Sequence, residues 1–358
     1  MNFLRKISLP FALIYWLIIV LRNKLYDWQL FHSRSFKIPT ISVGNINVGG
    51  TGKSPTVEYL IRLLKNDFKI STLSRGYGRK TSGFIEASAL SSPEEIGDEP
   101  TQFKQKFNDV NVVVDENRSR ALEILEHDYD AVILDDAFQH RKVKVGLQIL
   151  LFDYNKVFNK DWMLPFGNLR EPISGLNRAD IILITKTPKI FSPMERRRVE
   201  SHLPNPYNKP IVYSYLKYAE LKPLQEKFPI KLLGDFDKKT QVLLITGIAD
   251  ATLLINYLES HKLKISKHFN YADHYNYTVN DIEKWKYDYT SLIGENKIII
   301  TTEKDAMRLL HPKFENSISE IPIYYLPIES DIHDKDKEWF DNKVKDYVRA
   351  SKKHYGVH

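Results

Sequence analysis

Residues 41–55 read ISVGNINVGGTGKSP, an apolar run followed by a glycine-rich turn that ends in Gly52, Lys53 and Ser54. Glycines let successive backbone N–H groups turn toward phosphate oxygens, a lysine reaches the β and γ phosphates, and a serine hydroxyl can hold Mg²⁺. The segment therefore predicts a nucleotide-binding phosphate loop between a strand and a helix. An ordinary glycine-rich turn at this position is the alternative.

The loop departs from the usual pattern at one position, because Asn47 stands where a glycine is expected, and neighbouring glycines such as Gly44 supply the flexibility instead. The helix that follows the loop is expected to place its positive N-terminal end beneath the phosphates. The residues predicted to bind the nucleotide are Asn47, Gly49, Gly50, Thr51, Gly52, Lys53, Ser54 and Pro55.

Two aspartates, Asp135 and Asp136, directly follow the apolar run at 131–134. Carboxylates at the end of a strand beside a phosphate loop are typical ligands of the Mg²⁺ that accompanies a nucleotide. We therefore expect one of them to hold the metal, directly or through water. A turn with solvated acids is the alternative.

Another acidic residue, Asp98, lies in the turn GDEP at 97–100. Phosphoryl transfer to a hydroxyl needs a carboxylate or an imidazole that accepts the proton, and Asp98 is a candidate for this base. It is equally placed to stabilise the first turn of a helix through the helix dipole. The residues alone favour this second interpretation.

Basic residues follow several of the same strands, and cations gathered at one sheet edge can bind a phosphate group through bidentate hydrogen bonds. Each of them alone is better explained as a solvated surface charge. The residues in such positions are Arg75 in the loop at 73–80, Arg170 in GNLREP, and Arg118 and Arg120 after the run at 110–114.

Two further motifs lie in the C-terminal part of the chain. His274 belongs to the aromatic segment FNYADHY at 269–275, and a structural histidine is the better interpretation of this motif in isolation, although histidine titrates near physiological pH. Lys304 lies in TTEKDA at 301–306, which resembles a helix start capped by threonine. Lys304 either reaches a nucleotide or is a surface charge.

Short apolar runs of strand length alternate with helix-like segments through the first half of the chain. They occupy residues 40–43, 69–73, 110–114, 131–134, 147–152 and 181–185. This alternation is typical of a parallel sheet covered by helices on both faces, in which ligands bind at the carboxyl ends of the strands. The sequence therefore predicts an α/β fold like that of P-loop NTPases, with the motifs above at one edge of the sheet.

The pattern changes near residue 205, and apolar runs reappear at 241–245 and 297–301. Proline and polar residues are frequent between the two parts, and the run at 211–215 indicates an extended or β-type linker. The predicted division is an N-terminal apolar helix at 1–30, a P-loop domain at 31–205, a linker at 206–232, and a smaller α/β domain at 233–358 that includes a C-terminal surface helix.

Residues 7–21, ISLPFALIYWLIIVL, are almost wholly apolar and have basic residues on both sides. About 20 apolar residues are needed to cross the core of a bilayer, so this run is short for a span. No small-residue cleavage site of a signal peptide follows it. The sequence therefore predicts a helix partly embedded in one leaflet, and a helix buried against the protein's own core is the alternative.

The 358 residues carry a formal net charge of +7 and include no cysteine. The lack of cysteine excludes disulfides, zinc-thiolate sites and cysteine nucleophiles. The positive charge favours an acidic partner such as a phosphorylated substrate, an anionic membrane surface or nucleic acid. Because the chain contains no aromatic-basic module typical of nucleic-acid binding, we expect no nucleic-acid partner.

Taken together, the ordered motifs closely resemble those of the tetraacyldisaccharide 4'-kinases, the lipid A kinases of Gram-negative bacteria. They extend from the N-terminal apolar run to residue 308 and therefore cover most of the chain. The motifs that carry the resemblance are GNINVGGTGKSP, LSRGYGR, GDEP, DDAFQHR, GNLREP, DHY and TTEKDAMR.

The resemblance implies a kinase that uses ATP and Mg²⁺ to phosphorylate the 4'-hydroxyl of tetraacyldisaccharide 1-phosphate, giving lipid IVA in lipid A biosynthesis. It implies a peripheral or monotopic protein at the cytoplasmic face of the inner membrane, with no obligate protein partner. The implied roles are triphosphate and metal binding by Lys53 and Ser54, metal ligation by Asp135 and Asp136, base catalysis by Asp98 with support from His274, and headgroup binding by Arg75, Tyr77, Arg118 and Arg170.

Other classes of P-loop protein fit less well. A membrane-associated switch ATPase typically has a signature lysine five residues before the loop lysine, where this chain has Val48. Metal-insertion GTPases usually need cysteine or histidine clusters for their cargo. Because Asp98 and His274 lie in different predicted domains, we expect closure about residues 205–230 to bring them together.

Overall fold

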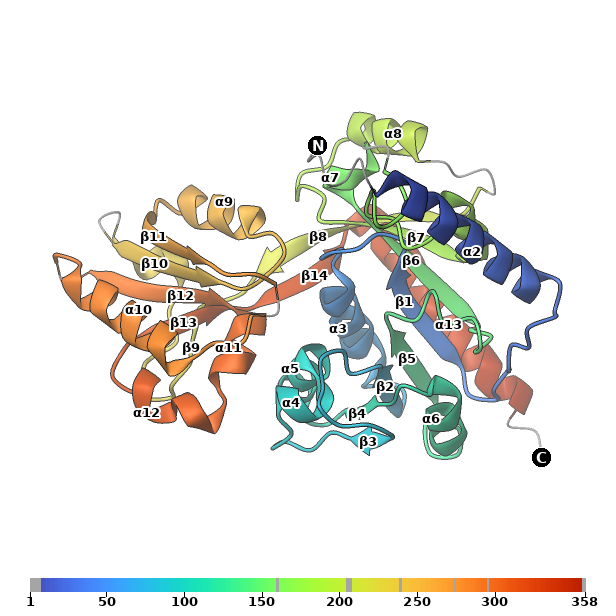
Figure 1. The fold of residues 1–358 in the computed structure, drawn as a ribbon, viewed down its shortest axis with the longest axis horizontal. Helices are drawn as coiled ribbons and strands as arrows, with labels where there is room; N and C mark the ends of the chain where they lie inside the picture. The colour runs from blue at the N-terminus through green and yellow to red at the C-terminus, as the bar shows by residue number, and fades with distance from the viewer. Residues whose placement is uncertain are drawn as a thin grey trace.

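The structure is a computed structural model that describes residues 8–158, 161–203, 208–237, 240–273, 275–294 and 296–355. It contains two α/β units, each built on its own sheet (Figure 1). Strands β8 (Ile211–Tyr218) and β14 (Ile328–Ile332) lie at the edge of the larger sheet and lead into the smaller unit. The predicted α/β class is confirmed.

Within the described residues, the larger sheet has nine strands in the order β14, β8, β7, β6, β1, β5, β2, β4, β3. Neighbouring strands are parallel, except that β3 pairs antiparallel with β4 and β14 pairs antiparallel with β8. All six apolar runs predicted to be strands overlap one of these strands. Besides β8 and β14, the strands are β1 (Thr40–Asn45), β2 (Ile70–Ser74), β3 (Ile85–Glu86), β4 (Asn111–Val114), β5 (Ala131–Asp135), β6 (Leu147–Asp153) and β7 (Ile181–Thr185).

Helices cover both faces of this sheet, which explains why its central strands are buried along nearly their whole length and why β5 and β7 are almost wholly apolar. On one face lie α3 (Lys53–Leu64), α5 (Asp98–Lys106) and α13 (Asp334–Tyr355), whose buried side chains share one core with β1 and β5. On the other face lie α6 (Arg118–Leu125) and α8 (Pro193–His202). Each aliphatic side chain buried in this way contributes about 1.5–3 kcal/mol. Shorter elements are α4 (Pro93–Ile96), α7 (Tyr154–Val157) and the 3-10 helix η1 (Ile173–Arg178).

The smaller unit is a second, mainly parallel sheet with the described strands in the order β11, β10, β12, β13, β9. Only β9, which contains Pro223, runs antiparallel to its neighbour, and an edge strand is where proline is tolerated. Its strands are β9 (Lys222–Pro223), β10 (Gln241–Thr246), β11 (Lys264–Asn270), β12 (Lys297–Thr302) and β13 (Ile323–Leu326). Its helices are α9 (Thr252–Ser260), α10 (Val279–Ser291), α11 (Glu303–Leu309) and α12 (Glu315–Ile318), with the 3-10 turns η2 (Leu233–Asp235) and η3 (Pro312–Phe314).

The C-terminal helix α13 packs on the larger sheet, although the sequence assigns it to the smaller domain at 233–358. Its buried side chains Phe340, Val344 and Val348 belong to the same core as the strands of the larger unit. Figure 1 shows α13 running along that sheet, away from the smaller unit. The chain therefore returns through β14, and the larger unit is built from two separate parts of the sequence.

The N-terminal helix α2 (Leu9–Asp27) lies on the outside of the larger unit (Figure 1). It buries only Ala12 and Ile19, while most of its apolar side chains are exposed. Among the described residues it is the one helix that is long and apolar enough to cross a membrane. The alternative of a helix buried in the protein's own core therefore does not describe α2.

Candidate active site

A cleft of about 910 Å³ lies between the two units at the carboxyl ends of the larger sheet's strands. The glycine-rich loop, the ends of β2, β5 and β6, and α5 line one side of it. The smaller unit contributes side chains such as Leu253 and Lys304, and α2 contributes Tyr15, Ile19 and Arg22. The motifs predicted at one sheet edge thus meet in one cleft, as expected for a parallel sheet.

Two glycines of the phosphate loop are required by their surroundings. A Cβ at Gly44 would lie 2.6 Å from the Cβ of Phe138, so only glycine lets the end of β1 pass beside the segment after β5. Gly52 has a φ of 83°, in the left-handed region, and α3 begins directly after it at Lys53. The N-terminus of α3, with its unpaired N–H groups and positive dipole, therefore points into the cleft.

Neighbouring strands hold the middle of the loop through Thr51. The side-chain amide of Asn45 donates to the Thr51 hydroxyl oxygen at 2.6 Å. The Thr185 hydroxyl, at the end of β7, donates to the Thr51 carbonyl at 2.8 Å. Lys186 contacts the carbonyl of Gly50 and pairs with Asp153 at 2.8 Å. These contacts fix the loop to the ends of β1, β6 and β7.

Lys53 and Arg170 both face the carboxylate of Asp136. The Lys53 ammonium lies 3.7 Å from Asp136 Oδ1, and an Arg170 guanidinium nitrogen lies 2.9 Å from Asp136 Oδ2. Burial opposes the ionisation of Asp136, but Lys53 and Arg170 outweigh it and lower the pKa of this carboxyl. Asp136 is therefore an anion flanked by two cations, beside the place where phosphates would bind.

Asp135 differs from its neighbour. Burial and the adjacent Asp136 raise its pKa to about 7, and its Oδ1 atom is buried without a hydrogen-bond partner. Arg118, which is 4% exposed, donates to the backbone carbonyls of Asp135 and Asp136 at 3.0 and 3.1 Å. Arg118 thereby fixes the turn that presents both carboxylates.

The donor set fits Mg²⁺. This ion prefers oxygen ligands, keeps several waters and uses one or two carboxylates together with substrate phosphates. The unpartnered oxygen of Asp135, the carboxylate of Asp136 and the hydroxyl of Ser54, which also lines the cleft, supply such ligands. Within the described part of the chain, no group of three or more His, Asp or Glu side chains is placed to hold a metal ion by itself.

The residues predicted to bind an anionic headgroup also line this cleft, and Arg22 and His140 join them. Burial and nearby arginines lower the pKa of His140 to about 4, so its imidazole is neutral at physiological pH. Arg120 instead pairs with Asp115 at 2.7 Å and does not line the cleft, which distinguishes it from Arg118. The cationic wall consists of Arg22, Arg75, Arg118 and Arg170, with Tyr77 and His140 beside them.

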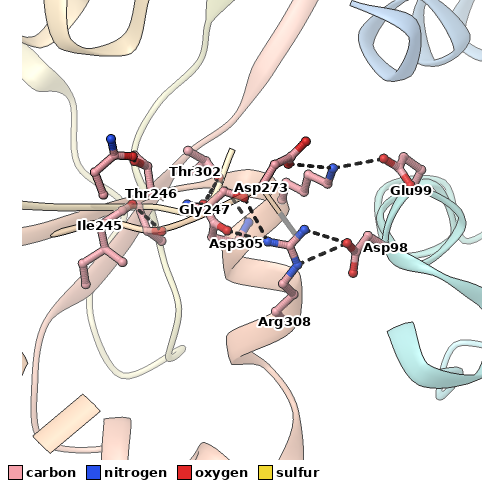
Figure 2. A network of polar contacts seen from close by, with 12 residues as sticks. Asp98, Glu99, Ile245, Thr246, Gly247, Asp273, Thr302, Asp305 and Arg308 are labelled. Carbon is pink, nitrogen blue, oxygen red and sulfur yellow. Dashed lines mark hydrogen bonds and ion pairs between the residues drawn. The ribbon is translucent and has the colours of Figure 1, made fainter. Parts of the chain in front are cut away.

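Asp98 lies at the first position of α5, where the sequence alone favoured a helix-stabilising acid. Its Oδ2 atom accepts hydrogen bonds from Arg308 of α11, at 2.6 Å from Nη2 and 3.2 Å from Nε (Figure 2). Next to it, Lys304 bridges Glu99 at 3.2 Å and Asp273 at 3.6 Å. Asp98 therefore lies where the two units meet, beside the cleft that Glu99 lines.

His274, the other residue predicted to act in proton transfer, lies outside the described residues. Its neighbour Asp273 faces the Lys304 and Glu99 pair in the same interface. The sequence did not single out Arg308, Arg22 or Lys186. Arg308 had a signal in the sequence, since it lies one helical turn after Lys304 in TTEKDAMR and shares its helix face. The sequence did not show that Arg308 pairs with Asp98 of the other unit.

Comparisons with a family model and with known proteins identify the same family. A family model described as tetraacyldisaccharide-1-P 4'-kinase matches residues 4–346. A tetraacyldisaccharide 4'-kinase from Phocaeicola vulgatus is 42% identical over 349 residues, which cover 96% of this chain and 94% of that protein. One from Flavobacterium psychrophilum is 42% identical over 356 residues, which cover 98% of this chain and 99% of that protein.

The structure is also similar to a crystal structure of LpxK from Aquifex aeolicus in complex with ATP. The TM-score is 0.71 at 29% sequence identity, and the match covers 96% of this chain and 99% of that chain. The similarity therefore extends over both units and over the cleft between them.

Proposed function

Since the chain belongs to the tetraacyldisaccharide-1-P 4'-kinase family, we propose that it transfers the γ-phosphate of ATP to the 4'-hydroxyl of tetraacyldisaccharide 1-phosphate. The product is the phosphorylated lipid A precursor, lipid IVA. The observation that carries this proposal is one cleft that combines a phosphate loop, paired aspartates and a cationic wall.

The groups on the loop side suit the triphosphate. Lys53 would exchange its contact with Asp136 for the β and γ phosphates, and the backbone N–H groups at the start of α3 would donate to phosphate oxygens. Ser54, Asp135 and Asp136 would hold Mg²⁺, which would supply positive charge against the developing charge on the phosphates. Arg170 remains beside Asp136 and balances the charge of that carboxylate.

Asp98 is the proposed base that accepts the proton of the 4'-hydroxyl. Asp98 lies at the start of α5, next to Glu99, which lines the cleft, so a sugar hydroxyl bound there would lie between this carboxylate and the γ-phosphate. His274 is proposed to support Asp98 from the smaller unit. The cationic wall of Arg75, Arg118 and Arg170 is proposed to bind the anionic lipid headgroup.

The lipid substrate explains the position of α2. A fatty-acyl chain cannot leave a bilayer without losing about 0.8 kcal/mol for each buried methylene, so the enzyme must reach the membrane. The α2 side chains Tyr15, Ile19 and Arg22 line the cleft, while the opposite apolar side chains of the helix are exposed. We place this helix at the cytoplasmic face of the inner membrane, where ATP is present.

The test is incubation of the purified full-length protein with γ-labelled ATP, Mg²⁺ and detergent-dispersed tetraacyldisaccharide 1-phosphate, followed by separation of the lipid. Label should appear in the lipid, and Asp98→Asn should reduce the rate at least 100-fold. Asp109→Asn, at an exposed acid that pairs with Lys65 on the surface, is the matched control and should retain activity. ATP hydrolysis without labelled lipid would instead support a membrane-associated switch.

A further inference from the structure

Arg308 joins the two units at the residue proposed to be the catalytic base. It belongs to α11 of the smaller unit, and its Nη2 and Nε atoms both donate to Oδ2 of Asp98 in the larger unit (Figure 2). Burial opposes ionisation of the guanidinium, but Asp98 and Asp305 outweigh it and raise the pKa of Arg308. Arg308 is therefore a guanidinium that stays charged and donates two hydrogen bonds to one oxygen of Asp98.

Arg308 is itself held in place from behind. Its Nη1 atom donates to Asp305 Oδ1 at 2.8 Å and to the Gly247 carbonyl at 3.2 Å. Asp305 is fully buried and accepts hydrogen bonds at its other oxygen from the Thr302 hydroxyl at 2.6 Å and from the Gly247 N–H at 2.8 Å. Residues at the ends of β10 and β12 therefore hold the guanidinium in place, although the Arg308 side chain is itself flexible.

Gly247 is part of this support because a side chain there would displace the carboxylate of Asp305. A Cβ at Gly247 would lie 2.9 Å from Asp305 Oδ1 and 3.4 Å from Arg308 Nη1. On the other side, Gly97 adopts a φ of 93° directly before Asp98, and a Cβ there would lie 3.0 Å from the Tyr77 carbonyl. Both ends of the Asp98–Arg308 contact are therefore fixed by backbone geometry.

We propose that Arg308 is a positioning residue for phosphoryl transfer, which orients the carboxylate of Asp98 toward the acceptor hydroxyl through the chain Thr302, Asp305, Arg308. The proposal rests on the proposed function of Asp98. With Oδ2 held by two N–H groups of Arg308, the orientation of the carboxylate relative to the acceptor hydroxyl is restrained. Because Arg308 comes from the smaller unit, the base is oriented only while the two units are in contact.

The contact between Arg308 and Asp98 also bears on the protonation of Asp98. A cation at hydrogen-bond distance favours the carboxylate, so loss of Arg308 raises the pKa of Asp98. The other described charged groups around it are Glu99 on its own helix, Lys304 and Asp305 on α11, and Asp273 in the adjacent loop. The acid limb of the kcat/KM profile should consequently move to higher pH in a variant without Arg308.

The experiment measures kcat, the KM for ATP and the pH profile of labelled-lipid formation for the wild type, Arg308→Gln, Arg308→Lys, Asp98→Asn and the double variant Arg308→Gln/Asp98→Asn. We expect Arg308→Gln to lower kcat by about 10- to 100-fold with a KM for ATP within about twofold of the wild type. Arg308→Lys should recover part of this loss. Since Arg308 acts through Asp98, its replacement in the Asp98→Asn background should change kcat by less than about twofold.

Lys106→Gln is the matched control, because Lys106 also joins α5 to α11, pairing with Glu303 at 3.1 Å, but does not contact Asp98. Thermal unfolding of every variant separates loss of fold from loss of positioning. The proposal is overturned if Arg308→Gln keeps the wild-type kcat and pH profile, if its effect multiplies with that of Asp98→Asn, or if Lys106→Gln causes the same loss. A wild type that labels no lipid refutes the proposed function instead, and an active Asp98→Asn refutes the base.

Discussion

Lys53 shows how strongly single residues in this cleft depend on their neighbours. Within the described residues, its ammonium forms one ion pair, with the carboxylate of Asp136 at 3.7 Å, and that carboxylate is also paired with Arg170. Arg170 can therefore keep Asp136 compensated when Lys53 moves to the phosphates. The proposed move of Lys53 to a phosphate would therefore not leave the Asp136 carboxylate without a cation.

Replacing Lys53 by alanine should lower kcat/KM at least 100-fold, because the charge that balances the β and γ phosphates is lost. The fold should remain, since Asp136 keeps its contact with Arg170. Labelled-lipid formation together with thermal unfolding checks both statements. A variant that transfers phosphate at the wild-type rate would show that the loop does not bind the triphosphate in this way.

A second prediction at the residue scale concerns Glu58, which is fully buried on α3 where α5 and α11 meet. Glu58 and Glu303 share Lys106, at 2.7 and 3.1 Å. Burial outweighs the attraction of Lys106 and raises the pKa of Glu58 to about 7, from an ordinary value of 4.5. Between these two pH values Glu58 is protonated in the folded state and ionised in the unfolded state. Its contribution to the free energy of unfolding therefore falls as pH rises from about 4.5 to 7.

The variant Glu58→Gln removes this titration. Its free energy of unfolding should therefore rise relative to that of the wild type as pH increases from 5 to 7, and then stay level. Urea unfolding at several pH values measures the difference. Glu86→Gln, at an exposed position, should show no such trend. A difference that does not vary with pH would mean that Glu58 is ionised in the folded protein.

At the scale of secondary-structure elements, α2 has two separate roles on two sides. Tyr15 donates a hydrogen bond to the carbonyl of Arg170 at 3.1 Å, and Arg141 donates to the carbonyl of Asn23 at 2.8 Å. Leu13 and Leu17, one turn apart, are more than half exposed. One side of the helix therefore contacts the cationic wall, and the other side exposes an apolar surface of the kind that binds a membrane or a partner.

The double variant Leu13→Gln/Leu17→Gln should bind vesicles of anionic phospholipid at least tenfold more weakly, because each leucine loses about 1.5–3 kcal/mol of apolar burial. Co-sedimentation with the vesicles measures this binding. Leu90→Gln is the control, since Leu90 is 93% exposed but lies far along the chain from α2. Equal weakening by the control would show that α2 is not the docking element.

At the scale of the whole molecule, α13 closes the larger unit after the chain has passed through the smaller one. Phe340 is fully buried, and its ring lies 6.0 Å from that of Tyr59 on α3. The Tyr59 hydroxyl also donates to Asp341 at 2.6 Å. Since α3 begins at the phosphate loop, the C-terminal helix supports the element that presents Lys53.

Phe340→Ala should destabilise the larger unit by about 3–5 kcal/mol, because it removes a large side chain from a packed core. Trp339→Ala, at the neighbouring, partly exposed position, should cost about 1 kcal/mol or less. Urea unfolding followed by fluorescence and by ATP binding measures both effects. Similar losses for the two variants would contradict the packing of α13 on the larger sheet.

Much of this protein could be predicted from the order of its residues alone. The strand that ends in Asp135 and the strand at 181–185 are almost wholly apolar, and the other central strands are short segments rich in apolar residues, because both faces of a parallel sheet are covered. The apolar face of α2 and the glycine-rich loop are likewise local patterns. A phosphate-binding α/β protein with an apolar N-terminal helix therefore follows from periodicity, burial and backbone freedom within short segments.

Only the tertiary structure decided which distant residues meet. Nothing local shows that Phe340 packs beside Tyr59, that Arg118 rather than Arg120 lies under the paired aspartates, or that Arg308 grips Asp98 from the other unit. A carboxylate at a helix start has the same sequence signature whether it caps the helix or serves as a base. The difference comes from long-range contacts, which depend on how the two sheets are placed and not on the pattern within either segment.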